Sequence, residues 1–82
     1  MVTTYTFREY EIAEDVIKCA KWHKANHHSR QIIIDCLFAG LYMAKYKEFI
    51  PLDLLWAKNE EIDAELTQLA EEMANKIYRG EI

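Results

Sequence analysis

Residues 32–44 form an almost uninterrupted apolar run, and this run constrains the fold more than any other stretch of the chain. It contains one charged side chain, Asp35, and is bounded by Arg30 before it and Lys45 after it. A membrane-spanning helix needs roughly 18 to 20 uninterrupted apolar residues, so a membrane span is not expected here. The Leu, Met and Ala residues of the run favour helix over strand. We therefore predict a helix over residues 29–48 that is buried around most of its circumference.

Two stripes of residues run along this helix. The polar stripe recurs at steps of three, four or seven and predicts the side that meets water; its members are His28, Gln31, Asp35, Tyr42 and Lys45. The second stripe has small side chains at steps of four, at Cys36, Gly40 and Ala44. A glycine inside a helix costs about 1 kcal/mol relative to alanine. Either another backbone, from a crossing helix or a second copy, approaches closely at Gly40, or Gly40 is a tolerated defect.

The residues before this helix predict a short extended segment and a first helix. Residues 2–6 are rich in Thr and Tyr, which favours extended backbone. Thr6-Phe7-Arg8-Glu9 then matches a capping box, in which the Thr hydroxyl and the Glu carboxylate satisfy backbone amides at a helix start. We predict a helix over residues 7–25, followed by a connection at residues 26–29 in which Asn26 takes the left-handed conformation and Ser29 caps the next helix.

A third helix is predicted over residues 53–79. Pro51 would end the second helix, Asp53 would cap the third, and Gly80 would stop it. Asn59 is the only polar member of a heptad-like seam in this region, so it either fixes the register against a partner or caps a helix that breaks and restarts at Glu60; we favour the cap, since two acidic residues follow it. The apolar members of the seam are Leu52, Leu55, Ile62, Leu66, Leu69, Met73 and Ile77.

The predicted fold is therefore an all-α, three-helix domain comprising residues 1–82, with a short extended N-terminal segment. A chain of 82 residues with 51% apolar residues is small for its apolar content, and such chains often complete their core by self-association, so we predict a homodimer. The two cysteines lie in predicted helices, and the N-terminus shows no signal-peptide pattern. These features favour a reduced, cytoplasmic protein.

The charge is unevenly placed along the chain. The net charge of -4 argues against general attraction to nucleic acids or membrane surfaces. Residues 51–82 hold eight Asp/Glu and only three Lys/Arg, which predicts an acidic outer face on the third helix. The first half holds a basic cluster that could contact phosphate, consisting of Lys18, Lys21, Lys24 and Arg30.

No pattern in the chain is specific for catalysis or for a cofactor. Cys19, His23 and His27 are spaced at i, i+4 and i+8 and are the best candidate metal ligands, but a structural zinc site normally takes four ligands from two segments. His28 and Asp35 would lie about 10 Å apart along a helix, too far for an acid–base pair. We therefore predict a protein without enzymatic activity, metal or cofactor.

One family resemblance is visible. A Thr-rich extended segment, a helix, a tight turn and the run Ser29-Arg30-Gln31-Ile32-Ile33-Ile34-Asp35-Cys36-Leu37 resemble, in this order, a ribbon-helix-helix repressor over roughly residues 2–47. The resemblance implies a dimer whose paired strands enter the major groove of DNA, with Thr4 and Thr6 outward and Tyr5 and Phe7 inward. Several such repressors are antitoxins with an added acidic helix that wraps a toxin, and residues 53–79 could serve as that helix.

The leading functional prediction is a non-enzymatic, helical protein-binding module that acts as an inhibitor or regulatory partner of another protein. Its predicted interaction residues are either the exposed aromatic and His-rich side chains or the acids of the third helix, namely Trp22, His23, Tyr42, Glu61, Glu65 and Glu72. The alternative is the ribbon-helix-helix repressor or antitoxin, which would bind DNA.

Overall fold

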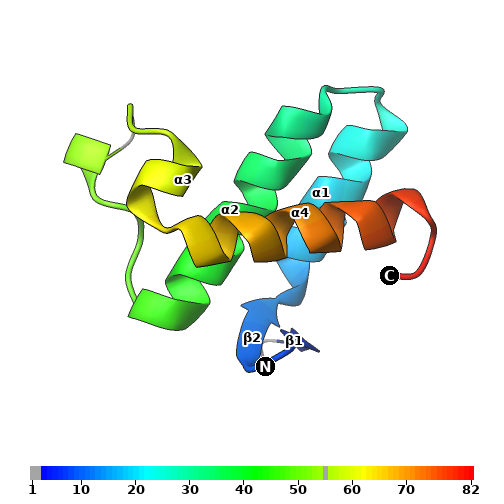
Figure 1. The fold of residues 1–82 in the computed structure, drawn as a ribbon. Coiled ribbons are helices and arrows are strands. Elements are labelled where there is room, and N and C mark those ends of the chain that lie inside the picture. Colours follow the sequence, from blue (N-terminus) through cyan, green and yellow to red (C-terminus); the bar gives the residue numbers. More distant parts are fainter. Residues whose placement is uncertain (1–2, 55) are drawn as a thin grey trace.

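The computed structural model describes residues 3–54 and 56–82, and in these residues the chain is mostly helical (Figure 1). A two-stranded antiparallel sheet at the N-terminus precedes the helices. In chain order the elements are β1 (Thr4–Phe7), β2 (Tyr10–Ala13), α1 (Glu14–Ala25), α2 (Arg30–Tyr46), a 3₁₀ helix (Leu52–Leu54), α3 (Asn59–Ile62) and α4 (Ala64–Tyr78).

β1 and β2 form a hairpin where the sequence predicted the start of a helix. Phe7 pairs with Tyr10 across a two-residue loop, in which Arg8 has a φ of 56°. Phe7 and Ile12 are buried, whereas Thr4 and Thr6 are exposed, as expected for side chains that alternate along a strand.

The predicted outward position of Thr4 and Thr6 is confirmed, but the capping box and the helix start at Phe7 are wrong. Residues 4–13 bury their apolar side chains by alternation, which requires extended backbone, so the helix begins only at Glu14. The predicted end of this helix near Ala25 is confirmed.

α2 begins and ends through local backbone contacts. Ser29 caps it, since its Oγ accepts a hydrogen bond from the backbone N–H of Ile32 at 3.4 Å. The left-handed residue in the preceding turn is His27, with φ of 57°, and not Asn26. At the other end Lys47 takes a left-handed conformation and donates its backbone N–H to the Met43 carbonyl. The prediction that Pro51 ends this helix is therefore wrong, because α2 has already stopped at Tyr46.

α2 is the central element, and it packs against α1, α4 and β2 (Figure 1). A Cβ placed on Gly40 would lie 2.6 Å from Cγ1 of Val16 on α1 and 3.1 Å from Cγ2 of Ile12 on β2. Gly40 therefore permits a close approach and is not a tolerated defect, but the predicted approach of another backbone is not what the structure shows. The approaching groups are side chains of the hairpin and of α1 in the same chain.

The helix predicted over residues 53–79, for which a break and restart at Glu60 was the favoured interpretation, is broken into several pieces. Asp63, with φ of -161°, has extended backbone between α3 and α4. Asn59 is the first residue of α3, whose N-cap is Lys58, so the interruption before α4 lies four residues beyond Asn59. Asp53 lies inside the 3₁₀ helix and does not cap a long helix. Gly80, with φ of 76°, follows the end of α4 as predicted.

Only the second half of the predicted seam is core. Leu66, Leu69, Met73 and Ile77 are buried, whereas Leu52 is 82% exposed and Leu55 lies outside the described residues. The largest fully buried side chains come from β2, α2 and α4 and include Ile12, Ile33, Leu37, Phe38, Leu41, Leu66 and Met73. Within the described ranges, no helix is long and apolar enough to span a membrane. The homodimer, the cytoplasmic location and the single domain stay predictions.

Candidate protein-binding surface

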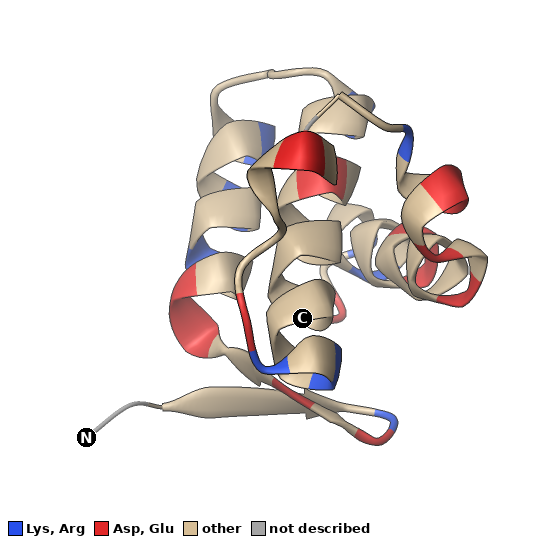
Figure 2. Ribbon diagram, turned by 90° about the vertical axis from the view of Figure 1, so that its left-hand side faces the viewer, with Lys and Arg blue, Asp and Glu red and all other residues tan. Residues whose placement is uncertain are grey.

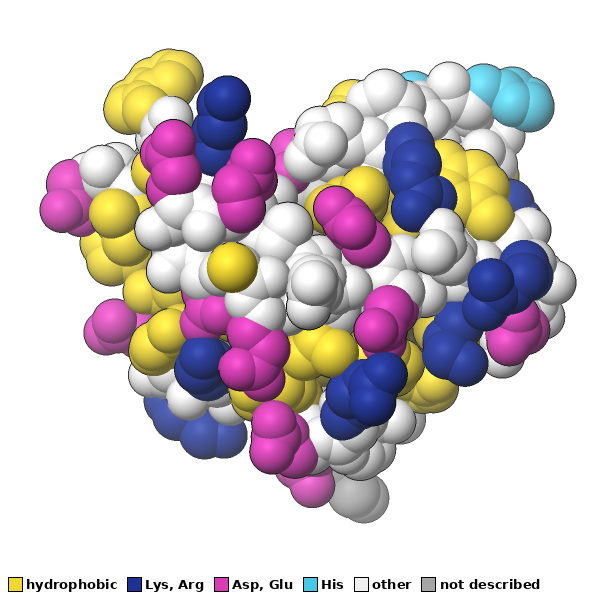
Figure 3. Space-filling model, viewed as in Figure 1, with side chains coloured by type: hydrophobic (Ala, Val, Ile, Leu, Met, Phe, Trp, Pro, Cys, Tyr) yellow, Lys and Arg dark blue, Asp and Glu magenta, His cyan; other side chains and the backbone are white. Residues whose placement is uncertain are grey.

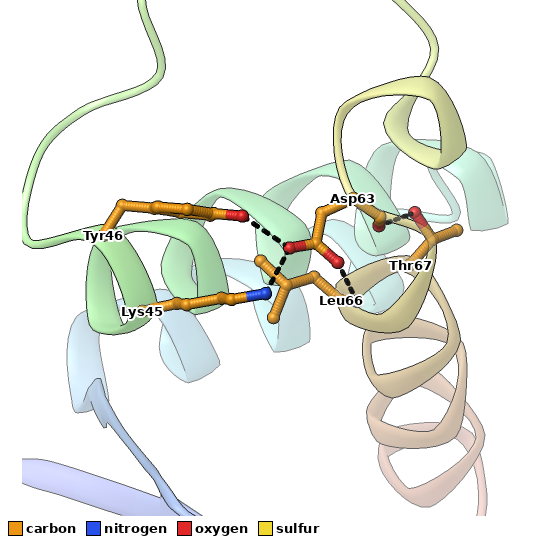
Figure 4. Close-up of polar contacts among 5 residues, drawn as sticks. All are labelled: Lys45, Tyr46, Asp63, Leu66 and Thr67. Atoms are coloured by element: carbon orange, nitrogen blue, oxygen red, sulfur yellow. Dashed lines mark hydrogen bonds and ion pairs between the residues drawn. The ribbon is translucent and has the colours of Figure 1, made fainter.

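The side chain of Asp63, at the start of α4, is hydrogen-bonded to residues at the end of α2. These bonds hold together the two ends of the connection between α2 and α4. One carboxylate oxygen accepts a hydrogen bond from the backbone N–H of Leu66 at 3.1 Å and caps α4. The other accepts from Lys45 Nζ at 2.6 Å and from the Tyr46 hydroxyl at 2.7 Å (Figure 4). The Thr67 hydroxyl donates to the Asp63 carbonyl at 2.9 Å. These contacts hold the two helices together around one carboxylate.

The protonation equilibria of this cluster follow its geometry. Although burial raises the pKa of Asp63, the hydrogen bonds from Lys45, Tyr46 and the backbone of Leu66 together bring it below its ordinary value. The hydrogen bond between Lys45 and Asp63 also raises the pKa of Lys45. Asp63 thus stays ionised, and its side chain is only 8% exposed.

Between these anchored ends, the connection exposes large apolar side chains. Phe49, Leu52 and Trp56 are 83%, 82% and 94% exposed, and we call these three side chains the loop surface. At 150–250 Å² for a large aromatic side chain, the loop surface presents on the order of 500 Å² of apolar area to solvent. Three large apolar side chains this exposed within residues 49–56 are unusual on a soluble protein, and such exposure commonly marks a binding site.

A groove lies beside the loop surface, between α2 and residues 50–62. Its volume is about 570 Å³, and its apolar lining comes from Phe38, Ile50, Leu54, Ala57 and Ile62. On its polar side, one oxygen of Asp35 accepts hydrogen bonds from Gln31 Nε2 at 2.8 Å and from Asn59 Nδ2 at 2.7 Å. The segment that exposes Phe49, Leu52 and Trp56 therefore also lines a groove with its Ile50 and Leu54 side chains.

Acidic side chains surround the loop surface and the groove. Figure 3 shows hydrophobic side chains among acidic ones at the end of the molecule that carries α3. Between residues 48 and 65 there is one lysine, Lys58, against six acids, Glu48, Asp53, Glu60, Glu61, Asp63 and Glu65. Asp63 pairs with Lys45, and in the described part of the chain no salt bridge involves the other five. Residues 48–65 therefore carry a formal charge of -5, from six acids and one lysine.

The predicted interaction residues are spread over different parts of the molecule. Trp22 is 57% exposed near the end of α1, where its ring contacts those of His23 and His28. Tyr42 is only 6% exposed, because its ring packs between those of Phe38 and Tyr46, so its predicted place on the water-facing stripe is wrong.

The predicted acids are exposed but do not gather with Trp22. Glu61 and Glu65 lie on α3 and α4, and Glu72 pairs with Arg8 at 2.6 Å. The end of α1 and helix α3 lie at opposite sides of the fold in Figure 1. The acids and the aromatic end around Trp22 therefore form separate surfaces.

The candidate metal ligands Cys19, His23 and His27 do not converge. His23 contacts His28 instead, with 2.7 Å between their Nδ1 atoms, while His27 takes up the left-handed position of the turn. Among the residues that the structure describes, no three His, Cys, Asp or Glu side chains are grouped as metal ligands would be.

The basic cluster divides into two pairs. Lys18 and Lys21 are exposed on α1, which carries acids at its first turn and bases farther along (Figure 2). Lys24 Nζ donates to the Ile77 carbonyl at 3.2 Å, and Arg30 donates to Asn75 Oδ1 at 2.6 Å. Both cations also lie over the ring of Tyr78. Lys24 and Arg30 thus attach α1 and α2 to the end of α4.

No protein-family model, no curated protein and no solved structure matches this chain.

The loop surface and its groove were not predicted from the sequence. Leu52 and Leu55 were assigned to the buried heptad-like seam of a third helix, so these residues were not expected at the surface. The signal that could have found them is the composition of residues 49–56, in which seven of eight residues are apolar and Pro51 interrupts any helix. Such a run is unusual in an exposed connection.

Proposed function

We propose that the protein is a non-enzymatic protein-binding module, an inhibitor or regulatory partner that binds another protein through the loop surface. The observation that carries this proposal is the exposure of Phe49, Leu52 and Trp56 on one short connection whose ends are anchored by Asp63. Exposed aromatic side chains lose water on binding and are the commonest anchors of protein interfaces. This surface replaces the dispersed residues that the sequence suggested.

The DNA-binding alternative has less support. The ribbon-helix-helix arrangement needs a strand that pairs with its copy in a second chain, whereas β1 here pairs with β2 of the same chain. Of the four bases suggested for phosphate contact, Lys24 and Arg30 bond to α4. No observation favours this function over protein binding.

The test compares Trp56→Ala with Trp22→Ala, because both remove an exposed tryptophan but from different ends of the molecule. We expect Trp56→Ala to leave the melting temperature within about 2 °C of wild type, since so exposed a side chain adds little to folding. It should also abolish a stoichiometric complex with a protein partner recovered from the source cells and reconstituted from purified components.

Trp22→Ala should retain that complex. If Trp56→Ala and Trp22→Ala bind the partner equally well, the loop surface is not the binding site. If Trp56→Ala unfolds the protein, the loop surface has a structural role instead.

A further inference from the structure

We infer that the loop surface and its groove accept a basic amphipathic helix, a segment with apolar residues along one face and Lys or Arg along its edges. This inference rests on the proposed function and adds the chemistry of the partner. It depends on three properties of the site, namely its apolar floor, its acceptor wall and the acidic charge around it.

The apolar floor suits the apolar face of a helix. Ile50 and Leu54 line the groove together with Phe38 of α2, while Phe49 and Trp56 of the same segment are exposed to solvent. A helix placed in the groove could cover both sets with residues spaced at i, i+3, i+4 and i+7, which is the usual way an amphipathic helix is recognised. A groove of about 570 Å³ accommodates a few such side chains.

The wall of the groove selects positive charge. Asp35 receives two amide donors, from Gln31 and Asn59, on a single oxygen. Amide donors do not neutralise a carboxylate, and Glu60 lines the same groove. Among the residues that the structure describes, Lys58 is the one cation that lines the groove, so a partner that brings Lys or Arg finds carboxylates without a salt bridge at its edge.

The acidic charge around the groove also disfavours a second copy of the chain, nucleic acid and anionic membranes as binding partners. A second copy that docked through the same surface would place two sets of acidic side chains, such as Glu60 and Glu61, against each other, and like charges at an interface are unfavourable. Nucleic acid and anionic membranes would meet the same repulsion.

The experiment uses two 18-residue peptides without aromatic residues, one of Leu and Lys with Leu at helical spacing, and one with Glu in place of every Lys. The chain has two tryptophans, Trp22 and Trp56. In a Trp22→Phe background the tryptophan fluorescence therefore comes from Trp56 alone, and this emission is the reporter. We expect the Leu/Lys peptide to shift this emission to the blue in a saturable way, and the Leu/Glu peptide to leave it unchanged.

Variants place the binding site. Phe49→Ala/Leu52→Ala should raise the Kd about tenfold or more, as loss of interface anchors does. Glu60→Gln/Glu61→Gln should raise it about three- to tenfold, since each exposed charge contributes modestly. The control Glu11→Gln/Glu71→Gln removes two charges outside the site and should leave the Kd unchanged.

Three results would overturn the inference. If the Leu/Glu peptide shifts Trp56 emission and the Leu/Lys peptide does not, the partner chemistry is wrong while the proposed function stands. If both double Gln variants weaken binding equally, the peptide follows the net charge and not the groove. If light scattering without peptide shows a dimer that Phe49→Ala/Leu52→Ala dissociates, the occupant is a second copy.

Discussion

Replacing Gly40 with alanine tests whether the glycine is required by packing. In a helix that is free of contacts the change would stabilise the protein by about 1 kcal/mol, because alanine is the better helix former. In this structure the new Cβ would lie 2.6 Å and 3.0 Å from the two methyl groups of Val16 and 3.1 Å from Ile12. Ordinary carbon–carbon contacts are about 3.5–4.0 Å.

Relief of this overlap is difficult. Val16 is β-branched and lies in α1, so one side-chain rotamer is strongly preferred, and both of its methyl groups face Gly40. Ile12 is fully buried. Inserting a methyl group into a packed site costs about 1–3 kcal/mol. When the helix-propensity gain of about 1 kcal/mol is subtracted, Gly40→Ala should destabilise the protein by about 0–2 kcal/mol, or by up to about 16 °C in melting temperature for a domain of this size.

The assay is urea unfolding followed by circular dichroism, with Gly40→Ala, Val16→Ala and the double variant forming a cycle. Val16→Ala removes the two methyl groups that clash with the new Cβ. The free energy of unfolding of the double variant should therefore exceed, by about 1 kcal/mol or more, the value predicted by adding the effects of the two single changes. A Gly40→Ala protein that is about 1 kcal/mol more stable than wild type would refute the packing argument and show a tolerated defect.

Two further predictions concern Asp63 and the cysteines. Asp63→Ala should cost about 2–4 kcal/mol in chemical unfolding, since it removes an N-cap and two hydrogen bonds to a nearly buried carboxylate, whereas Asp63→Asn should cost less because Asn also caps. The pKa of Asp63 is lowered on folding, so its contribution is fully present above its unfolded value near pH 4 and disappears as the pH falls through the folded pKa; Asp63→Asn should flatten the acid limb of the stability curve, and an unchanged limb would contradict this. Burial and the neighbouring Cys19 raise the pKa of Cys36 to about 12, so Cys36 is almost entirely in the unreactive thiol form at pH 8. Maleimide should label exposed Cys19 first, and equal labelling rates in the Cys19→Ser and Cys36→Ser proteins would be inconsistent with that burial.

Local sequence patterns correctly predicted α2 and the second half of the third helix, because the burial and ends of these elements depend on residues close to them in the sequence. The apolar run gave α2, and Ser29 capped it as expected. The second half of the heptad-like seam, from Leu66 to Ile77, forms the buried face of α4, and Gly80 follows its end in the left-handed conformation. In each case the periodicity or the capping residue acts within a few positions along the chain.

The hairpin, the interruption at Asp63 and the loop surface were decided by tertiary contacts. The residues around Tyr10 and Ile12 fit both a helical and an alternating pattern, and the alternating one prevails because Ile12 is buried beside Gly40, 28 positions away. Asp63 leaves the helical path because its carboxylate caps α4 and also accepts hydrogen bonds from Lys45 and Tyr46, 18 and 17 positions earlier. Local propensity could not reveal either contact, since hydrogen bonds and burial between distant residues exist only once the helices have packed.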